Sequence, residues 1–366
     1  MVAITKKVMP ILLVALAYLI GNQLYSQEQK QAKKIINLVG KEVATDSIDA
    51  YLAAQMLNLD VPGLSLAIIN DGKVVYHSVK GYADVGKGKK VTNKTIFEGA
   101  SLSKPLFAYF IMGFVEEGKL DLDRPLYNYL PYEDIASDAR YKKITARMVL
   151  SHTTGFPNWR TDHADNKLFL KFDPGTAYEY SGEGYQYLAK VLARILKVDD
   201  AGLEVAYQKR VAAPLNLEYT KYLQDRANMK NKAKGYRGKE AVKGDDDPRI
   251  FGAAFSIHSE ALDFSKWIIA LMNQEGLSKE SYLELFKTEV ILPEGHPQRQ
   301  SGLTEWTKGF AKASLPFGSV YAHGGNNPGF SSLFVMEPET KWGLIIFTNA
   351  NQSEIPLQLA QYLMQP

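Results

Sequence analysis

Short β-prone runs lie near both ends of this 366-residue chain, and helical patterns fill the stretch between them. Near the N-terminal end, Asp71-Gly72 separates two apolar runs within residues 62–83, and Asp-Gly in this setting is a strong signal for a two-residue hairpin. Three further runs, at 319–321, 331–336 and 342–349, are separated by turn-forming residues. This pattern predicts an antiparallel sheet built from both chain termini.

The middle of the chain carries apolar residues at helical spacing. These helical patterns cover 104–117, which Gly118 ends, 184–196 and 259–273, and a last helix starts from Leu357. Combined with the β-prone runs, they predict an α/β fold in which helices flank the sheet and a mainly helical second domain is inserted.

The length corresponds to about two packing units at roughly 150 residues each. We place the α/β sheet domain at 27–100 and 250–366, and the mainly helical domain at 101–249. The stretch 229–247 is rich in Lys and Gly and ends in three Asp. We interpret it as a solvated loop, with a loop that gates the substrate as the alternative.

The composition excludes several classes of protein. Hydrophobic residues make up 46% of the chain, which is enough for a large core and argues against extended disorder. Lys and Arg number 43 against 40 Asp and Glu, so the charge balance gives no reason to expect a nucleic-acid partner. Cys is absent, and this removes disulfides, thiol nucleophiles and Cys-ligated metal sites.

The first 26 residues have the pattern of an export signal. Lys6 and Lys7 precede the mostly apolar run 8–20, which is too short to span a membrane as a helix. We predict a signal peptide at 1–26, cleaved after Ser26, and a periplasmic or extracellular protein. An uncleaved membrane anchor is the alternative and the one route to membrane association. Residues 27–34 are interpreted as a tether or a first helix.

Ser101 and Lys104 form an S-x-x-K pattern at the start of the first helical segment. Residues three apart on a helix share a face, so the amine can reach the hydroxyl proton. Helix N-terminal N–H groups also favour an oxyanion nearby. The alternative is that Ser101 only caps the helix. A lysine with an ordinary pKa near 10.4 is a poor base at pH 7, so this role requires burial or a neighbouring cation, and a second group that handles the proton would help.

Three more motifs follow in a fixed order. They are LSHTTG at 150–155, PGTAYEYSGEGY at 174–185 and HGGNNPGF at 323–330. Together with the S-x-x-K pattern, they make the chain resemble the serine β-lactamase and penicillin-binding-protein superfamily, from about Asp60 to about Asn351. Within it, the likeness is to class C β-lactamases, D-alanyl-D-alanine carboxypeptidases, D-aminopeptidases and related esterases.

The resemblance implies a β-lactamase/transpeptidase-like fold with the site in a cleft between the sheet and the helical domain. It implies that Ser101 is the acylated nucleophile, Lys104 its partner in proton transfer, and Tyr180 the second group that handles the proton. The N–H groups of Ser101 and Asn326 would form the oxyanion hole.

His323, Gly324 and Gly325 match the triplet that lines the site in this superfamily, as a Lys-Thr-Gly or His-x-Gly sequence. Gly on that strand lets the substrate backbone approach closely. His323 stands where β-lactamases usually have Lys. Gly182 stands where many relatives have an Asn that holds a substrate carbonyl. For His152 we expect a structural hydrogen-bonding role.

We therefore predict an exported serine hydrolase that cleaves an amide or ester through a Ser101 acyl-enzyme. The first-choice substrates are D-amino-acid peptides and small esters, and the departures at Gly182 and His323 argue against antibiotic resistance. The alternative is a cell-envelope binding protein that keeps the cleft and lacks turnover. The motifs imply no cofactor and no metal, and leave the oligomeric state open.

Overall fold

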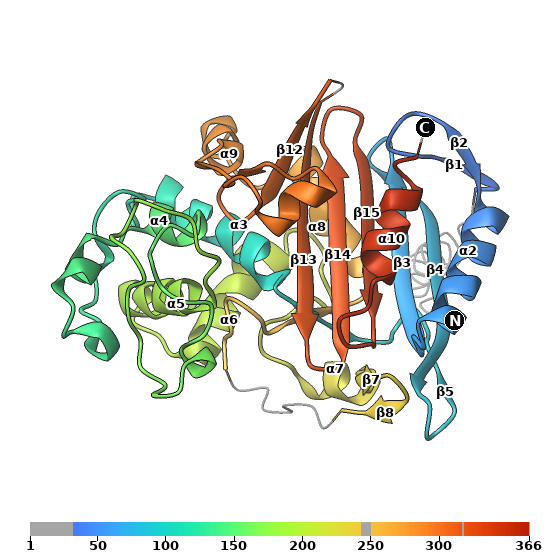
Figure 1. Ribbon diagram of the computed structural model, residues 1–366, viewed down its shortest axis with the longest axis horizontal. Coiled ribbons are helices and arrows are strands. Elements are labelled where there is room, and N and C mark those ends of the chain that lie inside the picture. The colour runs from blue at the N-terminus through green and yellow to red at the C-terminus, as the bar shows by residue number, and fades with distance from the viewer. Residues whose placement is uncertain (1–31, 243–249, 317, 366) are drawn as a thin grey trace, which may run out of the picture.

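The computed structural model describes residues 32–242, 250–316 and 318–365 (Figure 1). The predicted signal peptide and most of the predicted tether lie outside this part of the chain. Within the described residues, no helix combines the length and the apolar character needed to cross a membrane.

A nine-stranded sheet with antiparallel pairing throughout forms the centre of the fold. Its order is β10-β11-β12-β13-β14-β15-β3-β4-β5, so β15 from the C-terminal end lies beside β3 from the N-terminal end (Figure 1). The predicted hairpin is present, with Asn70 paired to Lys73 across the turn. The strands are β3 (Gly63–Asn70), β4 (Lys73–Asp84), β5 (Lys89–Lys90), β10 (Val290–Ile291), β11 (Glu305–Trp306), β12 (Ala311–Leu315), β13 (Gly318–Asn327), β14 (Phe330–Glu337) and β15 (Trp342–Thr348).

Both faces of the central strands are buried, and alternate residues go to different cores. In β15, Leu344 and Ile346 pack with α2 (Thr45–Asn58) and α10 (Ile355–Tyr362). Ile345 and Phe347 face the other core, with α3 (Ser103–Glu116) and α8 (Ala261–Met272). Successive side chains of a strand point to opposite faces of the sheet. Because helices cover both faces here, both sets of side chains are apolar, which explains the nearly continuous apolar runs in the sequence. The predicted α/β fold with helices flanking an antiparallel sheet is confirmed.

Most of the remaining helices form the part of the fold on the left of Figure 1. The helical patterns predicted at 104–117, 184–196 and 259–273 correspond to α3, α5 and α8, and the last helix starts two residues before Leu357. The domain boundaries, 27–100 with 250–366 for the sheet domain and 101–249 for the helical domain, remain a prediction. The other elements are β1 (Lys34–Ile36), β2 (Glu42–Ala44), β6 (Phe97–Ala100), α4 (Ala146–Leu150), α5 (Gly182–Leu196), α6 (Asp200–Tyr207), β9 (Ile257–Ser259) and α9 (Lys279–Phe286).

The stretch at 229–247 is predicted to be a solvated loop, but its described part, 229–242, contains regular secondary structure. It contains the end of α7 (Arg226–Asn231) and the small hairpin of β7 (Tyr236–Arg237) and β8 (Glu240–Ala241). Hydrogen bonds from Ile96 N–H to Asn231 O and from Ala233 N–H to Ile96 O attach it to the body. Residues 243–247 lie outside the described part.

Candidate active site

Ser101 lies in the turn between β6 and α3. Its predecessor Ala100 has φ 50°, a left-handed conformation that costs energy for a residue with a Cβ and is typical of functional turns. Ser103 stabilises this turn, because its hydroxyl donates to Ala100 O at 2.6 Å and accepts from Ile257 N–H at 2.9 Å. The N-cap of α3 is Leu102, so the structure does not support Ser101 as a cap.

Lys104 is completely buried one helical turn after Ser101. Its Nζ donates to Ser101 Oγ at 3.1 Å and to Ala254 O at 2.9 Å. Burial penalises the charged ammonium and lowers the pKa of Lys104 to about 7. The burial that a base role requires is therefore present.

Tyr180 reaches the same point from the segment that precedes α5. Its hydroxyl is hydrogen-bonded to the Ser101 side chain, and the Lys104 ammonium lies 4.6 Å from the centre of its ring. Burial raises the pKa of Tyr180 well above its ordinary value, although the hydrogen bond to Ser101 opposes this shift. The structure thus brings together the three groups named from the motifs, with a protonated phenol beside an amine that is easily deprotonated.

Strand β13 passes directly against the Ser101 turn. A Cβ on Gly325 would lie 2.2 Å from Gly99 O and 3.1 Å from Ser101 N, so only glycine allows this approach. His323 is buried on the same strand and donates from Nδ1 to Gly324 O at 2.7 Å. Burial, and secondarily the Lys104 charge, lower the pKa of His323 to about 3.

The other two residues predicted on β13 have different surroundings. Gly324 is exposed, and a Cβ there would meet nothing closer than 3.8 Å. The Asn326 side chain accepts a hydrogen bond from Ser331 Oγ at 2.8 Å. Its backbone follows Gly325, the residue in contact with the Ser101 turn.

Gly182 begins α5 and lies under an indole ring. A Cβ at this position would lie 2.5 Å from the six-membered ring of Trp159. The Gly182 N–H donates to the Asn158 side chain at 3.0 Å. Trp159 meets Phe255 edge to face, with ring centres 5.7 Å apart, and Phe255 follows the Ala254 carbonyl that binds Lys104. The motif comparison identified Gly182 but missed this half-buried aromatic pair.

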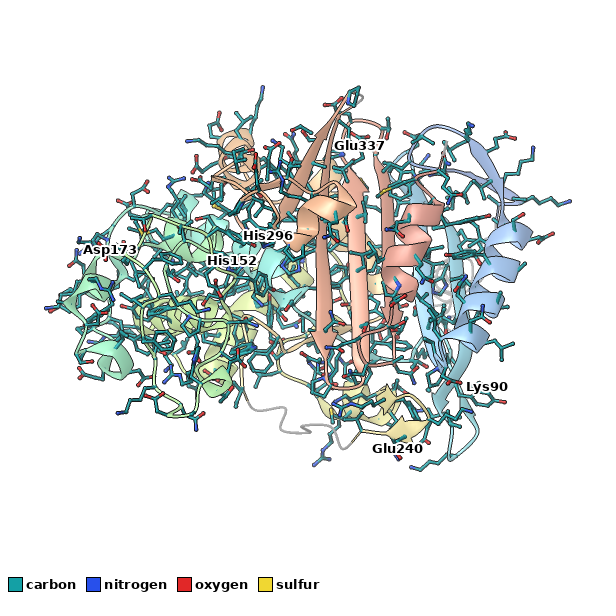
Figure 2. All side chains as sticks on the ribbon, in the orientation of Figure 1. Lys90, His152, Asp173, Glu240, His296 and Glu337 are labelled. Carbon is teal, nitrogen blue, oxygen red and sulfur yellow. The ribbon has the colours of Figure 1, made fainter. Side chains whose placement is uncertain are left out.

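His152 is fully buried where the helical part meets the sheet (Figure 2). Its Nδ1 accepts from Ser181 N–H at 3.0 Å, in agreement with the hydrogen-bonding role expected for it. Burial, with smaller contributions from Lys104 and His323, lowers its pKa well below the ordinary value. The neutral ring can accept at Nδ1 only if Nε2 carries the hydrogen.

The family match agrees with this geometry, since the Beta-lactamase family model matches residues 48–364. The chain belongs to the beta-lactamase family. The expected membership of the serine β-lactamase and penicillin-binding-protein superfamily is thereby confirmed.

Relatives of this beta-lactamase family member are distant. Protein flp of Staphylococcus aureus is 24% identical over 343 residues, which cover 86% of this chain and 65% of that protein. The chain thus spans less than two thirds of these relatives. A beta-lactamase of Escherichia coli is 28% identical over 219 residues, covering 57% of this chain and 56% of that enzyme.

Two solved structures share the fold. The octameric penicillin-binding protein homologue of Pyrococcus abyssi has a TM-score of 0.75 and 22% identity, with 87% of this chain and 76% of that chain covered. The D-alanine carboxypeptidase AmpC of Burkholderia cenocepacia has a TM-score of 0.73 and 20% identity, with 87% and 97% covered. The β-lactamase/transpeptidase-like fold implied by the motifs is confirmed.

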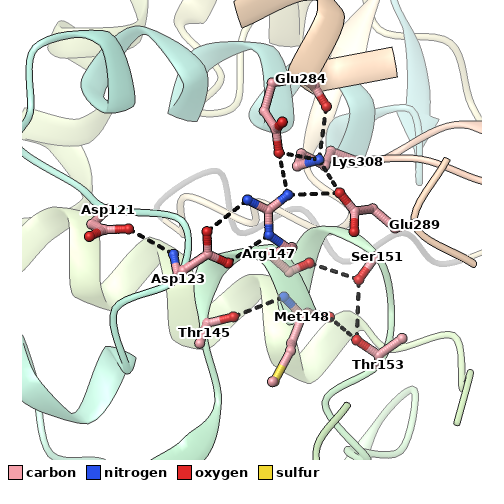
Figure 3. Close-up of polar contacts among 10 residues, drawn as sticks. All are labelled: Asp121, Asp123, Thr145, Arg147, Met148, Ser151, Thr153, Glu284, Glu289 and Lys308. Atoms are coloured by element: carbon pink, nitrogen blue, oxygen red, sulfur yellow. Dashed lines mark hydrogen bonds and ion pairs between the residues drawn. The ribbon is translucent and has the colours of Figure 1, made fainter. Parts of the chain in front are cut away.

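A charged cluster fixes the position of α4, which leads to His152. Arg147 binds Asp123 and Glu289, and the fully buried Lys308 also binds Glu289 (Figure 3). Both cations contact Glu284 as well. These residues come from four separate segments, so the sequence offered no local signal for the cluster.

The end of α4 is also held by hydrogen bonds to one carbonyl. Leu150 O accepts from Gly309 N–H at 2.9 Å, Tyr185 Oη at 3.3 Å and Trp306 Nε1 at 3.4 Å. Helix α5, which carries Tyr185, and the segment 306–309 therefore both contact α4 at Leu150, two residues before His152.

Proposed function

We propose that this protein is an exported serine hydrolase that cleaves an amide or ester bond through an acyl-enzyme on Ser101. The observation that carries the proposal is the buried Lys104 amine, 3.1 Å from the Ser101 hydroxyl and with a pKa lowered to about 7. An amine with this pKa is neutral in a large fraction of molecules at pH 7 and can accept a proton. Activated nucleophiles of serine hydrolases need such a neighbouring base.

In the first half of the reaction, Ser101 Oγ attacks the substrate carbonyl carbon while Lys104 Nζ takes the hydroxyl proton. Tyr180 keeps its own proton because its pKa is raised, and it donates this proton to the leaving nitrogen or oxygen as the bond breaks. The Lys104 ammonium then returns a proton to the phenolate. In the second half, Lys104 Nζ takes a proton from a water molecule that attacks the carbonyl carbon of the Ser101 ester. The bond to Ser101 Oγ then breaks, Ser101 regains the proton and the acid leaves.

The developing oxyanion is held by the N–H groups of Ser101 and Asn326. Support comes from β13, whose Gly325 backbone lies against Ser101 N. The strained Ala100 and the hydrogen bonds of Ser103 hold the N–H group of Ser101 in place before reaction. Such preorganised donors are worth about 3 to 4 kcal/mol of transition-state stabilisation each.

The substrate is a D-amino-acid peptide or a small ester. The peptide is favoured by the likeness to a D-alanine carboxypeptidase. The ester is favoured by Gly182, because the Trp159 indole covers the position from which an Asn amide would reach a substrate carbonyl. A half-buried indole beside Phe255 offers apolar contact in place of that amide. Recognition involves no nucleic acid, and catalysis requires no cofactor.

Export follows from the predicted signal peptide at 1–26. N-terminal sequencing of the protein secreted by an expressing bacterium checks this directly. A mature chain beginning at Gln27 supports cleavage, whereas retention of residues 1–26 in a membrane fraction supports the uncleaved anchor.

The activity is tested with the purified mature chain on p-nitrophenyl acetate, D-Ala-D-Ala peptides and nitrocefin, together with intact mass after exposure to a fluorophosphonate. We expect one covalent adduct and turnover of an ester or D-peptide. Ser101→Ala loses both, and the exposed Ser137→Ala serves as the matched control. Absence of adduct and turnover in the wild type would favour the binding protein without catalysis.

A further inference from the structure

His152 binds the backbone on both sides of Tyr180. Its carbonyl oxygen accepts from Glu179 N–H at 2.9 Å, and its ring Nδ1 accepts from Ser181 N–H at 3.0 Å. These two donors flank Tyr180 directly in the chain. One buried residue therefore fixes the short segment that carries the phenol.

The imidazole ring also packs against the phenol itself. The ring centres of His152 and Tyr180 are 4.4 Å apart, with the planes inclined by 35°. Trp306 and Tyr185 pack around the imidazole, with ring centres at 5.0 and 5.4 Å. The imidazole thus cannot move without displacing well-packed aromatic side chains.

The backbone of His152 is held in an unusual conformation that allows both contacts. Its φ is 59°, in the left-handed region where Asn, Asp and His are the most frequent non-glycine residues. The preceding turn is anchored through Leu150 O, which accepts three hydrogen bonds. The left-handed backbone lets the carbonyl and the ring of one residue face the same neighbouring segment.

We propose that His152 is a positioning residue that holds the Tyr180 hydroxyl against Ser101 through the hydrogen bond from Ser181 N–H to Nδ1. This inference rests on the proposed acyl-enzyme mechanism and adds a part to it. His152 does not act as the base, because its Nδ1 lone pair is already engaged by Ser181. Its effect passes through Tyr180, the group that delivers the proton to the leaving group.

A pair of carboxamide variants separates the two ring nitrogens. The side-chain oxygen of His152→Asn can stand where Nδ1 stands, and Asn tolerates a left-handed backbone. His152→Gln has the same functional group one methylene farther out, nearer the place of Nε2. The Asn variant keeps the acceptor for Ser181 N–H and the Gln variant loses it.

The readout is the dependence of kcat/KM on the leaving group, because kcat/KM reports acylation and both esters share the same deacylation step. Two esters with the same acetyl group are compared, p-nitrophenyl acetate, whose phenolate leaves without a proton, and ethyl acetate, whose alkoxide needs one. We expect His152→Gln to lower kcat/KM for the ethyl ester about 30-fold, and for the p-nitrophenyl ester less than threefold, since general acid catalysis is worth about 10² to 10⁴. His152→Asn stays within about threefold of wild type on both esters, and Tyr180→Phe shows the same selectivity as the Gln variant.

Equal losses on the two esters, or equal behaviour of the Asn and Gln variants, would overturn the inference. If the Gln variant does not fold by circular dichroism, the Asn variant decides alone. Retention of ethyl ester turnover supports the acceptor role, and a tenfold loss in a folded Asn variant overturns it. Failure of the proposed function is distinct, because the wild type would then turn over neither ester.

Discussion

Replacing Lys104 with methionine tests the proposed base most directly. The pKa of the wild-type amine, about 7, predicts that acylation of Ser101 by a neutral ester slows tenfold per pH unit below this value and is level above it. Methionine matches the lysine stem and lacks the amine. We expect Lys104→Met to lose this pH dependence and about 10² to 10⁴ of the acylation rate.

The same lowered pKa makes Lys104 a cost to stability. In the unfolded chain this lysine titrates near 10.5, so between about pH 7 and 10.5 the unfolded state binds a proton that the folded state does not. The contribution of Lys104 to the free energy of unfolding therefore rises with pH by about 1.4 kcal/mol per unit in this window. Below pH 7 Lys104 lowers the free energy of unfolding by its full amount. This amount is about 5 kcal/mol, because its pKa is lowered from 10.5 to about 7.

The methionine variant also leaves Ala254 O and Ser101 Oγ without their donor. Losing a partner for a buried polar group costs about 1 to 3 kcal/mol, and this loss does not depend on pH. Only the slope against pH therefore reports the pKa of the lysine, and the absolute difference between the two proteins does not.

Urea unfolding of both proteins at pH 7, 8 and 9 measures that slope. We expect the stability advantage of Lys104→Met to fall by about 2 to 3 kcal/mol from pH 7 to pH 9. The exposed Lys94→Met is the matched control and should show no such slope. A constant difference between Lys104→Met and wild type would mean that the folded lysine titrates normally, and the argument for Lys104 as the base would be refuted.

Four further variants are expected to separate catalysis, substrate contact and stability. Ser101→Ala lowers kcat about a thousandfold or more in ester hydrolysis. Gly325→Ala lowers kcat about a hundredfold with little change in KM, because its Cβ pushes β13 away from Ser101 N; unchanged kcat would place the oxyanion elsewhere. Trp159→Ala raises KM about tenfold for p-nitrophenyl benzoate and less than threefold for p-nitrophenyl acetate; equal changes would show that the indole does not contact the substrate. Lys308→Met destabilises the fold by about 1 to 3 kcal/mol in urea unfolding, since Glu289 and Glu284 O lose a buried donor while Arg147 still binds Glu289; no loss of stability would contradict this.

Local sequence patterns predicted the elements whose determinants are local. Asp71-Gly72 between β-prone runs identified the β3–β4 hairpin, and β-prone runs separated by turn-forming residues identified β14 and β15. Two-residue strands such as β10 and β11 were missed, because so few residues carry no periodicity. These strands are defined by pairing, since β11 pairs with β12 of the sheet and β10 pairs with β11.

In the candidate site, too, features with local determinants could be predicted from the sequence, and features that depend on tertiary contacts could not. The spacing of Ser101 and Lys104 indicated that their side chains could meet, because both lie within one helical turn. The role of Tyr180 as a second proton-handling group near Ser101 could be inferred only from the order of the motifs, since tertiary structure brings the two residues together. Burial of Lys104, which lowers its pKa, depends on packing from several elements and has no local pattern. The Trp159 ring over Gly182 is likewise a contact between separate segments.

In the proposed mechanism, the charge of Lys104 couples substrate recognition to catalysis. His152 and His323 are neutral at pH 7 because burial lowers their pKa values, so neither offers a positive charge to a substrate carboxylate. Lys104 can offer one only while protonated, and in that form it is unavailable as the base. For a substrate that depends on this ammonium for binding, each molecule of enzyme is suited to binding or to acylation, but not to both. An uncharged ester, or a peptide whose carboxylate lies away from Lys104, avoids this conflict, and the apolar contact offered by Trp159 and Phe255 suits such a group.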